Sequence, residues 1–378
     1  MPRVLVNMPT QYGGRPSGVA LVAFRVIAGL LDRGAVSVVL RSPWTRDQLP
    51  PAIRDRIEVI TVPRPRIMLF NVVRQAVAVP KLCRALDIDL VLNADPYGAA
   101  FGGRARVSVV HDLYFRTMPA RSRSREALTT DPIFRFVLGN SARIIAVSDS
   151  TKADLSRFYP FVRDRTHTIP SAAMLDPDAA DPSPDLPAGP FVLVVGNALY
   201  NKNFSTLARA MAALDRPEIG IVHVGEDRDE AIATALDGAP VRLTRLSRIS
   251  EGQLAALYRA ALCLCVPSFS EGFCLPVLEA QTLGCPVICS NRAATPEVAG
   301  AGALTFDPAD AGALTACLRR LFDEPGLRAE LIASGHENVR RYDWSETARR
   351  YEALILDALR DAARAKPARK MPHAHPAP

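Results

Sequence analysis

Two glutamates, Glu271 and Glu279, stand eight positions apart in the segment EGFCLPVLE. The segment follows an apolar stretch, residues 261–267, and precedes another at 286–290. We therefore expect a strand, a tight loop, a helix and a second strand. Pro276 favours the first turn of that helix, where its missing N–H costs nothing. We predict that Glu271 lies in the loop and Glu279 on the first helical turn.

The chemistry that this arrangement allows is phosphate binding. The backbone amides of Phe273, Cys274 and Leu275 would point outward without helical partners, and the N-terminal end of a helix attracts anions. The simpler interpretation is that Glu279 only complements the helix dipole and that Glu271 is a solvated loop residue.

A second candidate for charge chemistry is Lys202. It follows the predicted strand 191–196, which ends in Gly196, and it precedes a predicted helix. A lysine at this place could neutralise a leaving diphosphate, although a loop lysine is more often simply solvated. Asn197 and Asn201 in the same loop could each donate a hydrogen bond but bring no charge.

His111 and a glycine-rich turn are the candidates in the first half. His111 ends the predicted strand 107–110, and ligands of parallel sheets bind beyond the carboxyl ends of the strands. A structural histidine would explain the residue as well. Gly14 and Gly18 belong to a turn at residues 12–18 that opens a helix, and glycine lets the backbone approach a ligand closely.

The elements that must position these residues alternate between strand and helix twice along the 378 residues. This alternation predicts α/β architecture with parallel, doubly wound sheets. The predicted strands lie at 3–8, 36–40, 57–62, 90–93, 107–110, 191–196, 219–225, 241–243, 262–266, 286–290 and 303–306. The predicted helix N-caps are Ser17, Ser150 and Ser250. The predicted units are an N-terminal domain (1–172), a Pro- and Asp-rich linker (173–189), a C-terminal domain (190–344), a helix packing back toward the first domain (345–364) and a disordered tail (365–378).

The segment around the two glutamates resembles the signature of the retaining glycosyltransferases of family four, which have the GT-B fold. The resemblance extends from about Val266 to Pro308, with Pro296-Glu297 inside it, and is weaker in the first half. It implies two Rossmann-like domains facing each other across a cleft that holds a nucleotide-sugar donor. In that family the first glutamate contacts the donor sugar and the second binds the ribose hydroxyls.

The same resemblance implies roles for the other candidates. Lys202 matches a lysine that neutralises the diphosphate, and His111 matches a histidine near the donor sugar. Ile249 lies in a segment whose backbone runs beside the base. This chain departs from the family in carrying Asn197 and Asn201 where many members have an arginine. The predicted catalytic residues are Lys202, Glu271 and His111, and the predicted donor-binding residues are Gly14, Gly18, Gly196, Asn197, Asn201, Ile249, Phe273, Cys274, Leu275 and Glu279.

Charge is distributed unevenly along the chain. Residues 1–175 hold 25 Lys and Arg against 13 Asp and Glu, whereas the remainder holds 21 against 26. A basic first half favours an anionic partner, either a membrane surface or a phosphate-bearing lipid-linked acceptor. A general abundance of arginine explains it equally well. The basic segments 63–86 and 116–125 are candidates for such a contact, or else a core helix with a basic edge. No motif indicates nucleic-acid binding.

The bulk properties predict a cytoplasmic protein, at most peripheral on the inner face of the membrane. No apolar run approaches the length of a membrane span, and the N-terminus lacks a signal-peptide layout. Seven cysteines, most of them in apolar stretches, suit a reducing compartment. Asp227 and Asp229 form a D-x-D pattern, but GT-B enzymes work without a bound metal, so we expect neither metal nor cofactor.

The predicted function is transfer of a hexose from GDP-mannose or a UDP- or dTDP-hexose to a glycan or lipid-linked acceptor. We expect retention of the anomeric configuration, by the front-face route of the family, in cell-surface polysaccharide synthesis. The main alternative is a non-catalytic, glycosyltransferase-like subunit that binds a nucleotide or a partner enzyme. A sugar phosphorylase is a further alternative.

Overall fold

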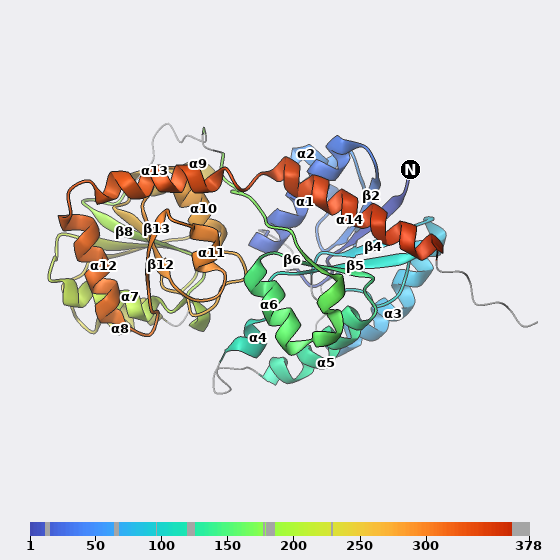
Figure 1. The fold of residues 1–378 in the computed structure, drawn as a ribbon, viewed down its shortest axis with the longest axis horizontal. Coiled ribbons are helices and arrows are strands. Elements are labelled where there is room, and N and C mark those ends of the chain that lie inside the picture. The colour runs from blue at the N-terminus through green and yellow to red at the C-terminus, as the bar shows by residue number, and fades with distance from the viewer. Residues whose placement is uncertain are drawn as a thin grey trace, which may run out of the picture.

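The computed structural model describes residues 1–11, 16–63, 68–95, 97–118, 125–176, 178, 186–227 and 230–364. Within these residues the chain forms two α/β domains side by side, each built on a parallel sheet (Figure 1). The predicted α/β, GT-B architecture of two doubly wound domains facing across a cleft is confirmed. The turn at residues 12–15, which contains Gly14, and the predicted tail 365–378 lie outside the described residues.

The first sheet has seven described strands in the order β3-β2-β1-β4-β5-β6-β7, all parallel. Its central strands β1, β4 and β5 are largely apolar and buried because helices cover both faces, whereas the edge strands β3 and β7 are more polar and more exposed. The seven strands are β1 Arg3–Asn7, β2 Ser37–Ser42, β3 Glu58–Thr61, β4 Leu90–Asn93, β5 Ala105–Val110, β6 Arg143–Ala146 and β7 Thr166–Thr168. The described helices of this domain are α1 Gly18–Arg33, α2 Pro51–Arg54, α3 Met68–Ala85, α4 Tyr114–Thr117, α5 Arg125–Gly139 and α6 Asp149–Phe158.

The second sheet has six described strands, in the order β10-β9-β8-β11-β12-β13, and is also parallel throughout. They are β8 Phe191–Val195, β9 Gly220–Val224, β10 Leu243–Leu246, β11 Cys263–Val266, β12 Val287–Ser290 and β13 Ala303–Phe306. The helices are α7 Phe204–Leu214, α8 Ala231–Leu236, α9 Glu251–Ala260, α10 Leu275–Thr282, α11 Thr295–Ala299, α12 Ala311–Asp323, α13 Leu327–Val339 and α14 Trp344–Arg364. Short 3-10 turns lie at Arg46–Gln48, Pro160–Arg165 and Tyr200–Lys202.

Most predicted strands agree with the structure within two residues, but three differences have physical reasons. The predicted strands did not include β6, which has only four residues, or β7, which has only three, all of them polar. It placed β10 at residues 241–243, whereas the strand occupies Leu243–Leu246. A turn at Gly238, with φ of 76°, and Pro240, which has no N–H to donate, delay entry into the sheet.

The last helix, α14, crosses back over the first domain and lies against α1 (Figure 1). A Cβ on Gly29 of α1 would come within 2.5 Å of the Ala348 Cβ, so glycine permits this close approach. Arg33 Nε donates to Glu352 Oε2 at 2.7 Å across the same interface. No described helix combines the length and apolarity needed to cross a bilayer.

The two domains also contact each other directly at the start of α6. Ser148, rather than the predicted Ser150, is the N-cap, because its Oγ accepts from the Thr151 amide at 3.0 Å. Ser148 Oγ also donates to the Gly272 carbonyl of the second domain at 2.7 Å. The amides of Asp149 and Ser150 donate to the two carboxylate oxygens of Glu297, at 2.8 and 3.0 Å. The α6 N-terminus therefore binds a carboxylate from the opposite domain.

Candidate active site

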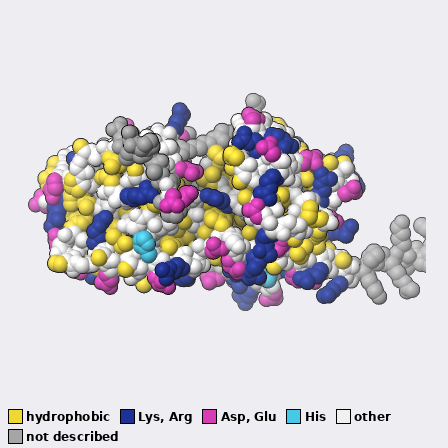
Figure 2. Space-filling model, turned by 90° about the horizontal axis from the view of Figure 1, so that it is seen from above, with side chains coloured by type: hydrophobic (Ala, Val, Ile, Leu, Met, Phe, Trp, Pro, Cys, Tyr) yellow, Lys and Arg dark blue, Asp and Glu magenta, His cyan; other side chains and the backbone are white. Residues whose placement is uncertain are grey.

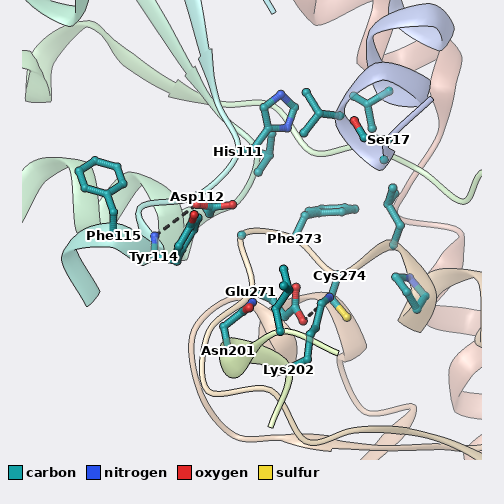
Figure 3. A pocket seen from close by; sticks show the side chains of 18 of the residues that line it. Ser17, His111, Asp112, Tyr114, Phe115, Asn201, Lys202, Glu271, Phe273 and Cys274 are labelled. Atoms are coloured by element: carbon teal, nitrogen blue, oxygen red, sulfur yellow. Dashed lines mark hydrogen bonds and ion pairs between the residues drawn. The ribbon is translucent and has the colours of Figure 1, made fainter. Parts of the chain in front are cut away.

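A cavity of about 740 Å³ lies between the domains, at the carboxyl ends of the strands of both sheets. Figure 3 shows His111 and Asp112 entering it from the first domain, opposite Lys202, Glu271 and Cys274 of the second. The predicted site residues that line it are Gly18, His111, Asn201, Lys202, Glu271, Phe273, Cys274 and Leu275. Residues from both halves of the chain thus share one site.

Lys202 and Glu271 form an ion pair inside the cavity, with Nζ and Oε1 2.7 Å apart. Burial is the largest single influence on Lys202 and acts to lower its pKa. The Glu271 carboxylate and smaller contributions from Cys274 and Asp112 together outweigh burial, so the pKa is raised. Lys202 is therefore charged at neutral pH. Ser268 Oγ donates to the same carboxylate oxygen at 2.6 Å and fixes its position. The lysine thus stays charged although only about a fifth of its side chain is exposed.

The N-terminus of α10 faces this ion pair. Cys274 is the N-cap and adopts a left-handed conformation, with φ of 80°, so the helix begins at Leu275. Within the described residues, no hydrogen bond occupies the backbone amides of Phe273, Cys274 and Leu275. These amides, the helix dipole and the lysine together provide a site for an anion such as a phosphate group.

The prediction that Glu279 lies on the first turn is wrong. Because the helix starts at Leu275, Glu279 falls on the second turn and is buried, with 7% of its surface exposed. The hydroxyl of Tyr258, on α9, donates to Glu279 Oε2 at 2.9 Å. Burial raises the pKa of Glu279 to about 7, although this hydrogen bond opposes the shift. Glu279 does not line the cavity around Lys202.

His111 follows β5 at the cavity wall, as predicted. Its Nε2 lies 3.1 Å from the Ala94 carbonyl, which can only accept, so Nε2 carries the proton. Burial lowers the pKa of His111 to about 4, so the ring is neutral at physiological pH. The next residue, Asp112, accepts from the Tyr114 amide at 3.2 Å and so holds the start of α4 beside the cavity.

Among the other predicted donor-binding residues, Asn201 lines the cavity, whereas Gly196, Asn197 and Ile249 do not. Gly196 does not line the cavity, but a Cβ there would lie 3.4 Å from Lys202 Cε. Asn197 accepts from the Glu226 amide at 3.1 Å, and Asn201 donates to the Ser270 carbonyl at 3.2 Å. Both asparagine side chains therefore hold the loops. Ile249 packs at the edge of the core and is also outside the cavity lining.

Metal binding finds no support among the described residues. No group of three His, Cys, Asp or Glu side chains in that part of the chain could hold a metal ion. Asp227 caps α8 by accepting from the Ala231 amide at 2.9 Å. Asp229, the other half of the D-x-D pattern, lies outside the described residues.

Several features of the site escaped the sequence analysis. The cross-domain carboxylate of Glu297 and the partner of Glu279, Tyr258, depend on tertiary contacts that no local pattern encodes. Gly272 is another: a Cβ there would lie only 1.6 Å from the His111 carbonyl oxygen. The Gly between the glutamates was visible in sequence, but its close approach to the other domain was not.

Two family models match the chain. Residues 16–176 match the model described as Glycosyltransferase Family 4, and residues 181–338 match the model described as Glycosyl transferases group 1. The chain is a family-four glycosyltransferase. The two matches cover every described strand except β1 and include every predicted catalytic residue.

This glycosyltransferase is similar to curated and solved proteins of the same kind. It is 27% identical over 267 residues to the O-antigen chain mannosyltransferase B of Escherichia coli, covering 66% of this chain and 70% of that one. Its fold is similar to that of sucrose-phosphate synthase from Thermosynechococcus elongatus, with a TM-score of 0.78, 20% identity, and 96% and 100% of the two chains covered. Anabaena Alr3699/HepE in complex with UDP-glucose superposes with a TM-score of 0.71 and 16% identity, over 94% and 99% of the chains.

Proposed function

We propose that this glycosyltransferase moves a hexose from a nucleoside-diphosphate sugar to a hydroxyl of a glycan or lipid-linked acceptor, with retention of configuration and without a metal. The observation that carries the proposal is the Lys202–Glu271 ion pair at the N-terminus of α10, inside a cavity between the domains. The lysine and the free amides bind the diphosphate, and Glu271 orients the donor sugar. Glu279, on the second turn of α10 and outside the lining of this cavity, accepts hydrogen bonds from ribose hydroxyls that extend beyond the cavity.

The chemical step needs no protein nucleophile in this proposal. An acceptor hydroxyl attacks the anomeric carbon as its bond to the phosphate oxygen breaks, on the same face of the sugar. The hydroxyl proton passes to the departing phosphate oxygen, whose negative charge Lys202 neutralises. Glu271 is already held by Lys202 and Ser268, so its arrangement suits orientation of sugar hydroxyls rather than covalent catalysis. Neutral His111 offers Nδ1 as an acceptor near the sugar.

GDP-mannose is the donor that we propose first, on the name of one relative. The Escherichia coli relative is a mannosyltransferase that acts on O-antigen chains, which supports a mannose donor and a role in cell-surface polysaccharide synthesis. The HepE structure holds UDP-glucose in the same fold, so UDP-hexoses, and with them dTDP-hexoses, are the second choice.

The test is turnover of GDP-mannose, UDP-glucose and dTDP-glucose, followed by proton NMR of the released or transferred sugar. We expect hydrolysis of one donor without acceptor, with the α-anomer formed first from an α-linked donor. First appearance of the β-anomer would contradict retention. Binding without any turnover would favour the non-catalytic subunit, and a strict need for orthophosphate would favour a phosphorylase. Added EDTA should leave the rate unchanged.

We also propose that the protein sits on the cytoplasmic face of an anionic membrane through α3 and α5. The outward side of α3 exposes Val73 and Val77 together with Arg74, Lys81 and Arg84. Beside it, Phe136 of α5 and Phe101, which lies between β4 and β5, form an exposed aromatic pair with ring centroids 5.7 Å apart. Figure 2 views the molecule from the side of α2 and α14 rather than from that of α5, and Lys and Arg side chains lie on the first domain, at right, in that view as well. Exposed apolar groups among cations suit an anionic bilayer surface.

Vesicle co-sedimentation tests this surface. We expect binding to phosphatidylglycerol-containing vesicles and little binding to pure phosphatidylcholine. The double variant Arg74→Glu, Arg84→Glu should lose binding, whereas the control double variant Arg320→Glu, Arg340→Glu, at exposed positions of the second domain, should retain it. Equal binding by both double variants would contradict the proposal.

A further inference from the structure

Aromatic side chains line the part of the cavity that the proposed donor site leaves unused. Tyr97, Tyr114, Phe115 and Tyr200 all line the cavity. Tyr114 is 54% exposed and Tyr200 is 53% exposed. Large apolar surfaces left open to water at a cavity mouth indicate a binding surface. In Figure 3, Tyr114 and Phe115 lie at the end of the cavity away from Ser17.

The two exposed tyrosines come from different domains, and a residue close to each of them in sequence contacts Ser270. Tyr114 begins α4, and Thr117 of that helix places its Oγ1 3.4 Å from Ser270 Oγ. On the other side, Asn201, next to Tyr200, donates to the Ser270 carbonyl at 3.2 Å. Ser270 immediately precedes Glu271, so both tyrosines belong to elements that flank the proposed reaction centre.

Contacts with neighbouring residues hold Tyr114 and Tyr200 in place. The Tyr200 ring packs on Phe269, with centroids 5.7 Å apart, and the Phe269 amide donates to the Asn201 carbonyl at 2.8 Å. The Tyr114 amide is held by the Asp112 carboxylate. A ring that is anchored at the backbone and open at one face loses little entropy when it binds a partner.

Polar groups are interleaved with the rings. Tyr97 Oη lies 3.3 Å from Thr130 Oγ1, and both residues line the cavity with the half-buried Asp112. A pyranose ring has apolar C–H faces and a rim of hydroxyls, so it fits aromatic faces that carry hydroxyls beside them. An acyl or polyprenyl chain would instead leave these polar groups without partners.

We infer that Tyr114 and Tyr200 are specificity-determining residues that stack on a sugar ring of a carbohydrate acceptor. The inference rests on the proposed function and narrows its acceptor to a molecule with a sugar at the reacting end, whether or not a lipid is attached further away. Because each domain supplies one of the two rings, the complete acceptor site forms only where the domains are in contact.

The experiment is saturation-transfer NMR and titration with the octyl glycosides of mannose, glucose, galactose and N-acetylglucosamine, each in the presence of GDP and of UDP. We expect saturation of the sugar-ring protons of at least one glycoside. Tyr114→Ala and Tyr200→Ala should each weaken its binding about tenfold, whereas Tyr114→Phe and Tyr200→Phe, which keep the ring faces, should stay within about threefold. Phe161→Ala, at an exposed aromatic residue outside the cavity lining, is the matched control.

Three results would overturn the inference. The first is that no glycoside receives saturation, and the second is that saturation is confined to the octyl chain, which would indicate a lipid site. The third is that the Phe variants lose as much affinity as the Ala variants. A thermal-shift measurement of nucleotide binding in the same variants separates failure of this inference from failure of the proposed function. The stabilisation by the nucleotide should be the same in the wild type and in all of these variants.

Discussion

The hydroxyl of Tyr258 donates a hydrogen bond of 2.9 Å to Oε2 of Glu279, and both side chains are buried. Burial raises the pKa of Glu279 to about 7, and the hydrogen bond favours the charged form. Tyr258 thus helps to keep the proposed ribose-binding carboxylate ionised near neutral pH and leaves its other oxygen for the ligand.

Replacing Tyr258 by phenylalanine should therefore change the pH dependence of donor binding. The pKa of Glu279 is raised from its ordinary value, so nucleotide affinity in the wild-type protein should fall as the pH drops through about 7. Loss of a hydrogen bond to a charged group, typically about 1.5–3 kcal/mol, should move this midpoint upward by about one to two pH units. Calorimetric titration of the nucleotide at a series of pH values measures the shift.

A matched control for this variant is Tyr159→Phe, which removes another buried tyrosine hydrogen bond to a carboxylate, that of Asp131 in the first domain. It should leave the pH profile of nucleotide binding where it is. A Tyr258→Phe profile that coincides with the wild-type profile would show that the hydrogen bond does not tune Glu279.

Gly272 should tolerate no side chain. A Cβ would lie 1.6 Å from the His111 carbonyl oxygen, so Gly272→Ala must push the two domains apart at the reaction centre. We expect turnover to fall by about 10²-fold or more, because misplacement of about 1 Å has effects of this size. Circular dichroism should remain normal. Gly139→Ala, where a Cβ meets nothing within 4 Å, should retain activity, and full activity of Gly272→Ala would contradict the described domain contact.

Glu297 should act as a link between the domains. Its carboxylate accepts from two amides at the N-terminus of α6, a favourable position for a negative charge worth up to about 2 kcal/mol. Glu297→Ala should increase the radius of gyration in small-angle X-ray scattering, because the domains separate more often. Glu337→Ala, in an exposed pair on α13, is the control. Unchanged scattering of the Glu297 variant would rule out this role.

Much of the fold and part of the candidate site could be predicted from the sequence. Apolar strands covered on both faces, such as β1 and β8, read as short continuous hydrophobic runs, and a run bounded by Gly or Pro can be located within a residue or two. The loop that carries Lys202 and the loop that carries Glu271 both end parallel strands of one sheet, so their convergence follows from topology.

What the sequence could not provide depends on distances between segments far apart in the chain. Pro276 lies in the first turn of α10 as predicted, but the burial of Glu279 on the second turn and its hydrogen bond from Tyr258 depend on the packing of α9. The contacts of Gly272 with His111 and of Glu297 with α6 arise only when the domains meet. The proposed sugar-stacking residues Tyr114 and Tyr200 likewise come from two different domains.

The central claim is that the Lys202 cavity binds the diphosphate of the donor. A thermal-shift titration of GDP, UDP, dTDP and ADP against the wild-type protein and Lys202→Ala tests it most directly, with Lys152→Ala on α6 as the control. One nucleotide, at about 100 times its Kd, should stabilise the wild type and the control by about 2.7 kcal/mol. The same concentration should stabilise Lys202→Ala far less, and its kcat should fall by about 10²-fold or more. An equal shift in Lys202→Ala, or no shift with any nucleotide, would contradict the account.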